Sequence, residues 1–471
     1  MVFSSLPFLY LFLPVVLILY VVVQDMKIRN LILLLASLFF YAWGEPKWII
    51  LMIISTFVEY VGALVLDRNR GTWKAKAAVA TSVTVALSFL FIFKYLDFFS
   101  FNINTIFHTN LKLLNLTLPI GISFYTFQTI TYIVDVYRGR ANVQRNFFDL
   151  LLYVSMFPQL IAGPIVKYVD IEAQIQNRVI SVRKAGDGLI RFLAGMFKKV
   201  LLANVAGEVA STMLDGKLTS VSVVGAWIGL FAYTFQIYFD FSAYSDMAIG
   251  LGKMLGFDYP ENFNYPYTAT SISDFWNRWH MSLTTFFREY VYIPLGGNRK
   301  HHVFNLFLIW FLTGFWHGAS WNFIIWGLYY FVLIVCEKLF LGRILERRPA
   351  FLARIYTMFM VILGWGLFYF DDMDRLRKFF SVLFGFGANG FYNAADGTLF
   401  VNHILFFLLA ILAVTPLSQT LKRTYRYFVD RHPSLSVPGD ALLIVHAMAL
   451  LFVNTAAMVG STYNPFLYFR F

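Results

Sequence analysis

Long runs of apolar residues without a charged side chain recur along the whole chain. The clearest are Leu6–Val23, Ala77–Phe93, Val221–Phe239, Leu399–Leu417 and Ala441–Val459. Each is close to the ~20 residues that an α-helix needs to cross a bilayer. They are apolar on every face, whereas a transmembrane strand alternates over ~10 residues. The pattern therefore predicts membrane-spanning helices.

Runs that carry one or two polar residues raise the number of predicted crossings to about eleven. These runs are Trp48–Leu66, Leu118–Val136, Phe147–Val166, Leu189–Met213 and Phe351–Phe370. Three shorter runs fit tilted pairs, half-helices or re-entrant segments: Leu31–Trp43, Val303–Trp316 and Trp321–Val335. No repeat and no long polar insertion divides the chain. We therefore predict an all-α polytopic membrane protein forming a single membrane domain over residues 1–471.

Composition supports a membrane protein, because 59% hydrophobic and 14% charged residues leave too little polar surface to cover a soluble globule. The first apolar run lacks a basic flank and an Ala-x-Ala site, so we expect it to stay in the mature protein rather than leave as a signal peptide. The single cysteine, Cys336, excludes intrachain disulfides and thiolate clusters. We expect no metal site.

The net charge of +12 would suggest nucleic acid in a soluble protein. Here many Lys and Arg residues lie in short loops beside apolar runs, which the positive-inside rule explains without a nucleic-acid partner. Two basic loops, one with Lys27 and Arg29 and one spanning Arg68–Lys76, are predicted to be cytoplasmic, with the N-terminus outside. The basic residues after Val166 would lie on the outer side of the membrane in this orientation. They lie in the cytoplasm only if the segment before them is re-entrant rather than a full crossing.

Polar residues interrupt the apolar background in three regions, and ionisable groups at membrane depth are candidates for function. The first region, Phe235–Met247, holds Asp240, Tyr244, Ser245 and Asp246 at the end of a long apolar run. Asp240 and Tyr244 share a helix face because they are four residues apart. Either these side chains bind substrate, or the carboxylates cap backbone amides at a helix end or pair with arginines.

The second region, Asp274–Tyr290, has aromatic residues at spacings of three and four, typical of an amphipathic helix. Trp276, Arg278 and Arg288 are candidates for substrate binding, although Trp and Arg are also ordinary interfacial anchors. His280 lies within the aromatic stripe and is harder to explain as an anchor.

The third region, Phe311–Trp321, places His317 in an apolar setting beside Trp316, which is a candidate for substrate binding. A lone buried histidine is more often a hydrogen-bonded core residue than a catalyst. An apolar setting nevertheless favours the neutral imidazole, which is the state that a general base requires. Gly314 and Gly318 leave room for close helix packing or for a narrow ligand.

Seven motifs follow one another along the chain: Leu118–Tyr125, Tyr132–Gly139, Phe157–Pro164, Phe239–Gly250, Phe275–Gly297, Trp316–Gly318 and Asn464–Phe469. Taken in order, they resemble the membrane-bound O-acyltransferase family over essentially the whole chain. The later ones are similar to the bacterial branch that O-acetylates alginate, peptidoglycan and related polysaccharides. Ala243 stands where relatives commonly have glycine.

The resemblance implies a ring of tilted helices around a central tunnel, with His317 as the essential histidine and His280 as the second signature histidine. It implies acetyl-CoA as donor substrate, no bound cofactor, and His317 as the base that deprotonates the acceptor hydroxyl. It also implies an extracytoplasmic esterase-like partner protein and a place in the bacterial cytoplasmic (inner) membrane. Basic candidates for the CoA phosphates, which positive-inside flanking also explains, are Lys198, Lys199, Arg288 and Arg299.

Two alternatives stay open from the sequence. A transporter or flippase of an activated sugar or lipid would use the polar groups only for binding and would not depend on a histidine. A longer-chain O-acyltransferase would need a longer acyl tunnel, whose length the sequence does not give. The acceptor polysaccharide, the route of transfer and the oligomeric state are also open.

Overall fold

The computed structural model describes residues 1–432, 436–460 and 467, and this part of the chain is helical, without strands. The all-α fold class predicted from the apolar runs is thereby confirmed. Backbone contacts group the chain into two compact units. Unit 1 holds Met1–Phe192, Ser245–Glu261 and Thr285–Tyr290, and unit 2 holds Leu193–Tyr244, Asn262–Thr284 and Val291–Phe471. The single membrane domain over residues 1–471 stays a prediction.

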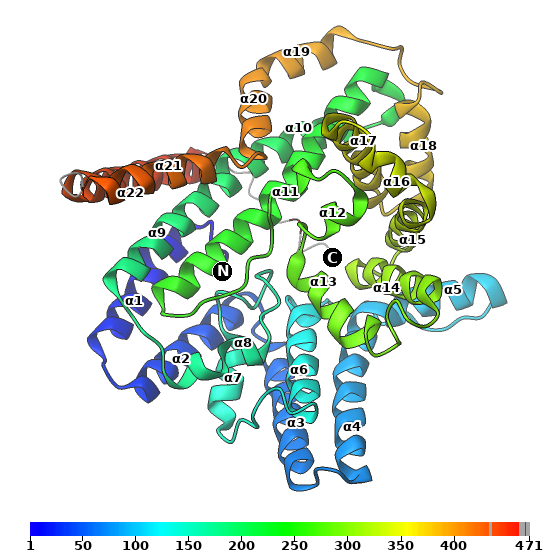
Figure 1. The fold of residues 1–471 in the computed structure, drawn as a ribbon. Helices are drawn as coiled ribbons and strands as arrows, with labels where there is room; N and C mark the ends of the chain where they lie inside the picture. The colour runs from blue at the N-terminus through cyan, green and yellow to red at the C-terminus, as the bar shows by residue number, and fades with distance from the viewer. Residues whose placement is uncertain (433–435, 461–466, 468–471) are drawn as a thin grey trace. The chain divides into compact units, whose positions relative to one another are not determined.

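Unit 1 is built mainly from the N-terminal helices. In it α3, α4 and α6 pack against one another, and α2 packs against α7 (Figure 1). Phenylalanine rings fill the core beside α1 and α2, with Phe12 5.4 Å and Phe40 5.7 Å from Phe157, centroid to centroid. The helices are α1 (Leu13–Val22), α2 (Met26–Gly44), α3 (Ile49–Arg68), α4 (Trp73–Leu90), α5 (Leu96–Phe107), α6 (Ile122–Tyr137), α7 (Phe147–Ser155), α8 (Tyr168–Gln176) and most of α9 (Val182–Phe197).

Helix α6 is buried on nearly all its faces although it carries several polar side chains. Thr131 Oγ1 donates to the carbonyl oxygen of Gln128 at 2.8 Å, so its hydroxyl is satisfied within the helix. A helix that is buried all round is surrounded by protein rather than by lipid or water. The run Leu118–Val136 was predicted as a crossing, and the structure makes its helix part of the interior of unit 1.

The predicted crossing Phe147–Val166 is not one continuous helix. Helix α7 ends at Ser155, and the chain then runs through turns and irregular backbone around Pro158 and Gly163. These residues are buried. Irregular backbone at membrane depth is tolerated where protein covers it. A non-spanning segment here agrees with the re-entrant geometry that the basic residues after Val166 required.

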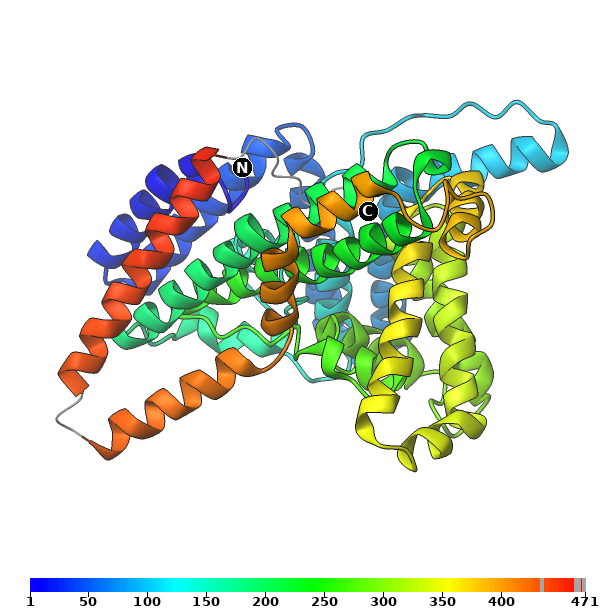
Figure 2. The same cartoon turned by 90° about the horizontal axis from the view of Figure 1, so that it is seen from above.

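Unit 2 contains the remaining helices. In it α15 packs against both α14 and α17 (Figure 2). Helix α12 packs against α15 and α17. Its helices are α10 (Asn204–Leu214), the first part of α11 (Val223–Met254), α12 (Ile272–Trp276), the start of α13 (Met281–Phe287), α14 (His302–His317), α15 (Trp321–Cys336), α16 (Gly342–Glu346), α17 (Ala350–Tyr369), α18 (Met373–Leu383), α19 (Ala394–Asn402), α20 (Ile404–Ala413), α21 (Leu417–Arg431) and α22 (Ser436–Gly460).

Six stretches of helix in the described residues are long and apolar enough to cross a membrane, and α19 with α20, bent by 56°, would make a seventh. The protein is therefore polytopic, as predicted. The count of about eleven and the ring around a tunnel stay predictions. The six stretches are Met26–Gly44, Ile49–Arg68, Trp73–Phe107, Trp321–Glu346, Ala350–Tyr369 and Asp440–Gly460.

Candidate active site

The two histidines identified in the sequence lie together in unit 2, each in contact with the ring of Trp316. The Trp316 ring centroid is 4.9 Å from that of His317 and 5.9 Å from that of His280. His280 is 1% exposed and His317 5% exposed. Residues far apart in the sequence thus form one buried cluster, which we call the histidine centre: His280, Trp316 and His317.

His317 is held by aromatic rings from two further helices. It is the last residue of α14, which ends there because Gly318 has an extended backbone. Trp326 on α15 and Phe368 on α17 meet the imidazole edge-on, at centroid distances of 5.0 Å and 5.2 Å. Three helices therefore fix the imidazole, since its ring can turn only if theirs move.

Glycines bring α14 and α15 into backbone contact one turn before His317. A Cβ atom on Gly314 would strike the carbonyl oxygen of Phe323 and lie 3.2 Å from the Cα of Gly327. A Cβ atom on Gly327 would in turn strike the carbonyl oxygen of Trp310. The close helix packing predicted at Gly314 is confirmed, and it places the end of α14 against α15.

His280 occupies the turn between α12 and α13. Its backbone is left-handed, with φ of 45°, a conformation that is uncommon for a residue with a side chain. Its Nδ1 atom lies 3.1 Å from Oδ1 of Asn262, and the ring of Phe241 meets the imidazole edge-on at 4.6 Å. His280 lies outside the candidate membrane spans, and burial holds its pKa well below the ordinary value. The ring is therefore neutral at physiological pH.

Trp276 and Arg278 have partners that do not include either histidine. The Trp276 ring is buried against Trp310 and Tyr330, each at a centroid distance of 4.9 Å. Arg278 is half-buried, and its Nε donates to Asp274 at 2.7 Å. These contacts favour a packing role for Trp276 and a helix ion pair for Arg278.

Asp240, on α11, forms a buried ion pair. Its Oδ1 atom lies 2.5 Å from Nζ of Lys199, and the two side chains are 2% and 4% exposed. Its Oδ2 atom accepts the backbone N–H of Leu467 at 2.8 Å. This geometry favours an ion pair for Asp240 over substrate binding, with a lysine where the sequence predicted an arginine. The pair uses Lys199, which was also a candidate for CoA phosphates. Tyr244, one turn later, is buried as well.

Ser245, Asp246 and Arg288 belong to unit 1, whereas the histidine centre belongs to unit 2. Asp246 accepts from Arg191 at 2.9 Å, and Arg191 also pairs with Glu261. Ser245 is buried. Arg288 is exposed, so its guanidinium is accessible to an anion.

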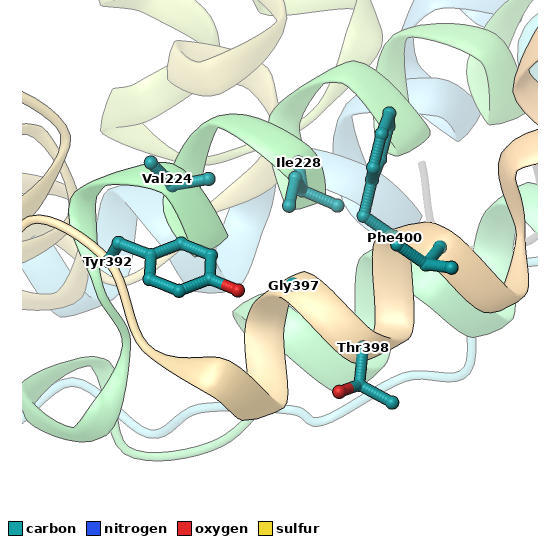
Figure 3. Close-up of a pocket in the computed structure, with 7 residues that line it drawn as sticks. Val224, Ile228, Tyr392, Gly397, Thr398 and Phe400 are labelled. Atoms are coloured by element: carbon teal, nitrogen blue, oxygen red, sulfur yellow. The ribbon is translucent and has the colours of Figure 1, made fainter.

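A cavity of about 400 Å³ lies elsewhere in unit 2, between α11 and α19. In Figure 3 the Tyr392 ring points toward Gly397, and Ile228 and Phe400 close the other side. Its lining is largely apolar and contains none of the predicted site residues. Among the described residues no group of three or more His, Cys, Asp or Glu side chains is placed to hold a metal ion.

The sequence missed two residues that matter for this geometry. Asn262 contacts His280 from a position 18 residues earlier, and Arg191 meets Asp246 from 55 residues earlier. Asn262 lies in a polar loop, and Arg191 lies near the start of the predicted crossing Leu189–Met213. Neither has a local signal that marks its partner.

Fold and site together define a helical membrane protein with a buried histidine centre. Residues 26–373 match the membrane-bound O-acyltransferase family. A probable alginate O-acetylase of Pseudomonas putida is 37% identical over the full length of both chains. A peptidoglycan O-acetyltransferase of Helicobacter pylori is 33% identical, covering 100% of this chain and 98% of its own. A teichoic acid D-alanyltransferase of Bacillus subtilis is 30% identical over 48% of this chain and 60% of its own.

The chain belongs to the membrane-bound O-acyltransferase family, and it is a multi-pass membrane O-acyltransferase. The resemblance identified from the motifs is thereby confirmed, and membership of an enzyme family supports the acyltransferase over the transporter alternative. An acyltransferase needs an acyl donor substrate. The closing motif Asn464–Phe469 lies outside the described residues except for Leu467.

Proposed function

We propose that this protein takes acetyl from cytoplasmic acetyl-CoA and passes it through a central tunnel for O-acetylation of an extracytoplasmic polysaccharide. The final transfer uses an esterase-like partner protein outside the membrane, and the enzyme resides in the bacterial cytoplasmic membrane. The names of the relatives from Pseudomonas putida and Helicobacter pylori support the reaction class. The observation that carries the proposal is the buried histidine centre, with His317 held at the end of α14.

In this mechanism His317 is the general base. It accepts the proton of the acceptor hydroxyl while that oxygen attacks the thioester carbonyl carbon. The new C–O bond forms, the C–S bond breaks, and CoA leaves as a thiolate that takes the proton back from the imidazolium. Neutral imidazole therefore starts and ends the cycle, and no bound cofactor is needed.

Aromatic rings hold His317 in place. The rings of Trp316, Trp326 and Phe368 all have centroids within 5.2 Å of the imidazole centroid. The names of the relatives from Pseudomonas putida and Helicobacter pylori favour acetyl over the longer-chain alternative.

The other predicted substrate-binding residues fall into two groups: those for which the structure gives an ion pair or an aromatic contact, and those that are kept as substrate contacts. Tyr244 and Ser245 are retained as substrate contacts, and exposed Arg288 is retained for the CoA phosphates because guanidinium pairs well with phosphate. For Asp240, Asp246 and Arg278 the ion pairs support roles in holding the fold. Trp316 contacts both histidines, whereas Trp276 packs against Trp310 and Tyr330.

Donor choice tests the proposed function. The purified protein in nanodiscs is supplied with its esterase-like partner and with either acetyl-CoA or palmitoyl-CoA, and free CoA thiol is measured over time. We expect release of CoA from acetyl-CoA and little from palmitoyl-CoA. The reverse order would replace the proposal with the longer-chain O-acyltransferase, and no release from either donor would contradict acyl-CoA as the donor.

A further inference from the structure

Asn262 contacts His280 on one edge of the imidazole. The residue is 1% exposed, and its Oδ1 atom lies 3.1 Å from Nδ1 of His280. The same oxygen accepts the backbone N–H of Ser282 at 3.2 Å and the Ser282 hydroxyl at 2.9 Å. The amide oxygen of Asn262 therefore contacts both the imidazole of His280 and Ser282.

These contacts determine which nitrogen of His280 carries the hydrogen. A backbone N–H only donates, so the Asn262 atom that faces Ser282 must be the amide oxygen and not the amide nitrogen. That oxygen only accepts, so His280 Nδ1 must be the donor in their hydrogen bond. A neutral imidazole has one N–H, which leaves Nε2 as a bare acceptor.

The acceptor nitrogen is buried, and it has no hydrogen-bond partner among the residues that the structure describes. A buried polar atom of this kind normally has a partner, and exceptions occur at functional sites. Trp316 lies beside this ring and beside His317. A substrate group that approaches His317 is therefore the natural partner for His280 Nε2.

The backbone around His280 holds the same arrangement. Met281 N–H donates to the carbonyl oxygen of Asn262 at 3.0 Å, and Asn264 N–H donates to that of Arg278 at 2.9 Å. The two segments are thus paired on both sides of the histidine. This pairing stabilises the left-handed backbone of His280, a conformation that is uncommon for a residue with a side chain.

We propose that Asn262 is a positioning residue for acyl transfer: it fixes His280 as the Nδ1–H tautomer, so that Nε2 accepts a hydrogen bond from a substrate O–H or N–H group. The inference rests on the proposed function, because it places His280 in the acyl-transfer site. In this tautomer His280 does not stabilise the oxyanion of the reaction. An oxyanion or thioester carbonyl oxygen accepts hydrogen bonds, and the non-protonated Nε2 has no hydrogen to donate.

The tautomer is measured directly by ¹⁵N NMR of the full-length protein in nanodiscs, with ¹⁵N-labelled histidine and His280→Gln to assign the signals. In the wild type we expect a protonated Nδ1 and a non-protonated Nε2 for His280 at neutral pH. A protonated Nε2 in the wild type would overturn the proposal. This readout needs no enzymatic activity, so it is independent of whether acetyl-CoA is the donor.

Two substitutions of Asn262 separate positioning from general support of the fold. Asn262→Ala removes the acceptor, and we expect the Nδ1–H signal of His280 to disappear or mix with the Nε2–H form. Asn262→Asp keeps the acceptor and adds a negative charge, which stabilises the imidazolium. We expect it to retain Nδ1–H but to charge His280 at a higher pH, moving the acid limb of kcat to higher pH.

Ser282→Ala is the matched control. It removes the hydroxyl that donates to Asn262 and that lies 3.5 Å from His280 Nδ1, but it leaves the closer contact between Asn262 and His280. It should keep the wild-type tautomer. An unchanged tautomer in folded Asn262→Ala, or an unchanged acid limb in folded Asn262→Asp, would contradict the positioning role. If Asn262→Ala fails to fold, the wild-type spectrum and Asn262→Asp still decide the question.

Discussion

At the scale of single residues, Lys199 and Asp240 form the most buried ion pair among the residues that the structure describes in unit 2. Both side chains are at most 4% exposed and lie 2.5 Å apart. Removing one partner leaves a buried charge uncompensated, which costs about 3–5 kcal/mol. We therefore expect Lys199→Met and Asp240→Asn each to lower the Tm strongly, as measured by fluorescence-detected thermal unfolding in detergent.

The double variant Lys199→Met with Asp240→Leu is the control for this ion pair. Because it removes both charges, it should recover much of the Tm lost in Lys199→Met. A single variant with the wild-type Tm would show that the pair does not stabilise the fold. Lys217→Met, at an exposed position of the same unit, should have a much smaller effect because Lys217 is not part of this ion pair.

The sequence predicted the histidines but not their partners. His280 and His317 stood out because ionisable groups are rare in apolar stretches. The acceptor for His280 and the cation for Asp240 are brought together only by the fold, from 18 and 41 residues away along the chain. Lys199 in particular followed the ordinary pattern of basic residues beside an apolar run, which concealed its buried position.

At the scale of elements, the crossing of α14 and α15 sets the position of His317. Gly314→Ala would place a methyl group against the carbonyl oxygen of Phe323, where only backbone movement makes room. Overpacking of this kind costs about 1–3 kcal/mol, and a shift of about 1 Å at a catalytic group can lower its rate about 100-fold. We expect lower thermal stability and a marked loss of acyl transfer in this variant.

Gly216→Ala is the matched control, because a Cβ atom at Gly216 meets nothing within 4 Å. It should retain both stability and activity. Wild-type activity and wild-type Tm in Gly314→Ala would show that the tight crossing does not position His317.

Helix type was predictable from apolar runs, whereas helix continuity was not. Leu118–Val136 and Phe147–Val166 have the composition of crossings, yet one contains a protein-covered helix and the other breaks after Ser155. Hydropathy does not distinguish burial in protein from burial in lipid, because both favour apolar side chains. Pro158 and Gly163 are present in the sequence, but the sequence did not predict that the helix would end and the chain turn there.

At the scale of the whole molecule, the basic loops predict the orientation in the membrane. The helix Trp73–Phe107 should run from the cytoplasm, at the basic residues before it, to the outside. In a Cys336→Ser background we expect a membrane-impermeant maleimide to label Asn110→Cys in intact spheroplasts and Lys76→Cys only after permeabilisation. Both positions are exposed in unit 1. Labelling in the opposite order would invert the proposed topology.

The central claim is that His317 is the general base of an acyl-CoA-dependent reaction. The most direct measurement compares CoA release from acetyl-CoA by the wild type, His317→Ala, His317→Gln and His446→Ala, with folding matched by size-exclusion profile and Tm. His446 is an exposed histidine on α22 and serves as control. The account predicts a loss of about 10²- to 10⁴-fold in both His317 variants and none in His446→Ala. Wild-type turnover by a folded His317 variant would contradict it.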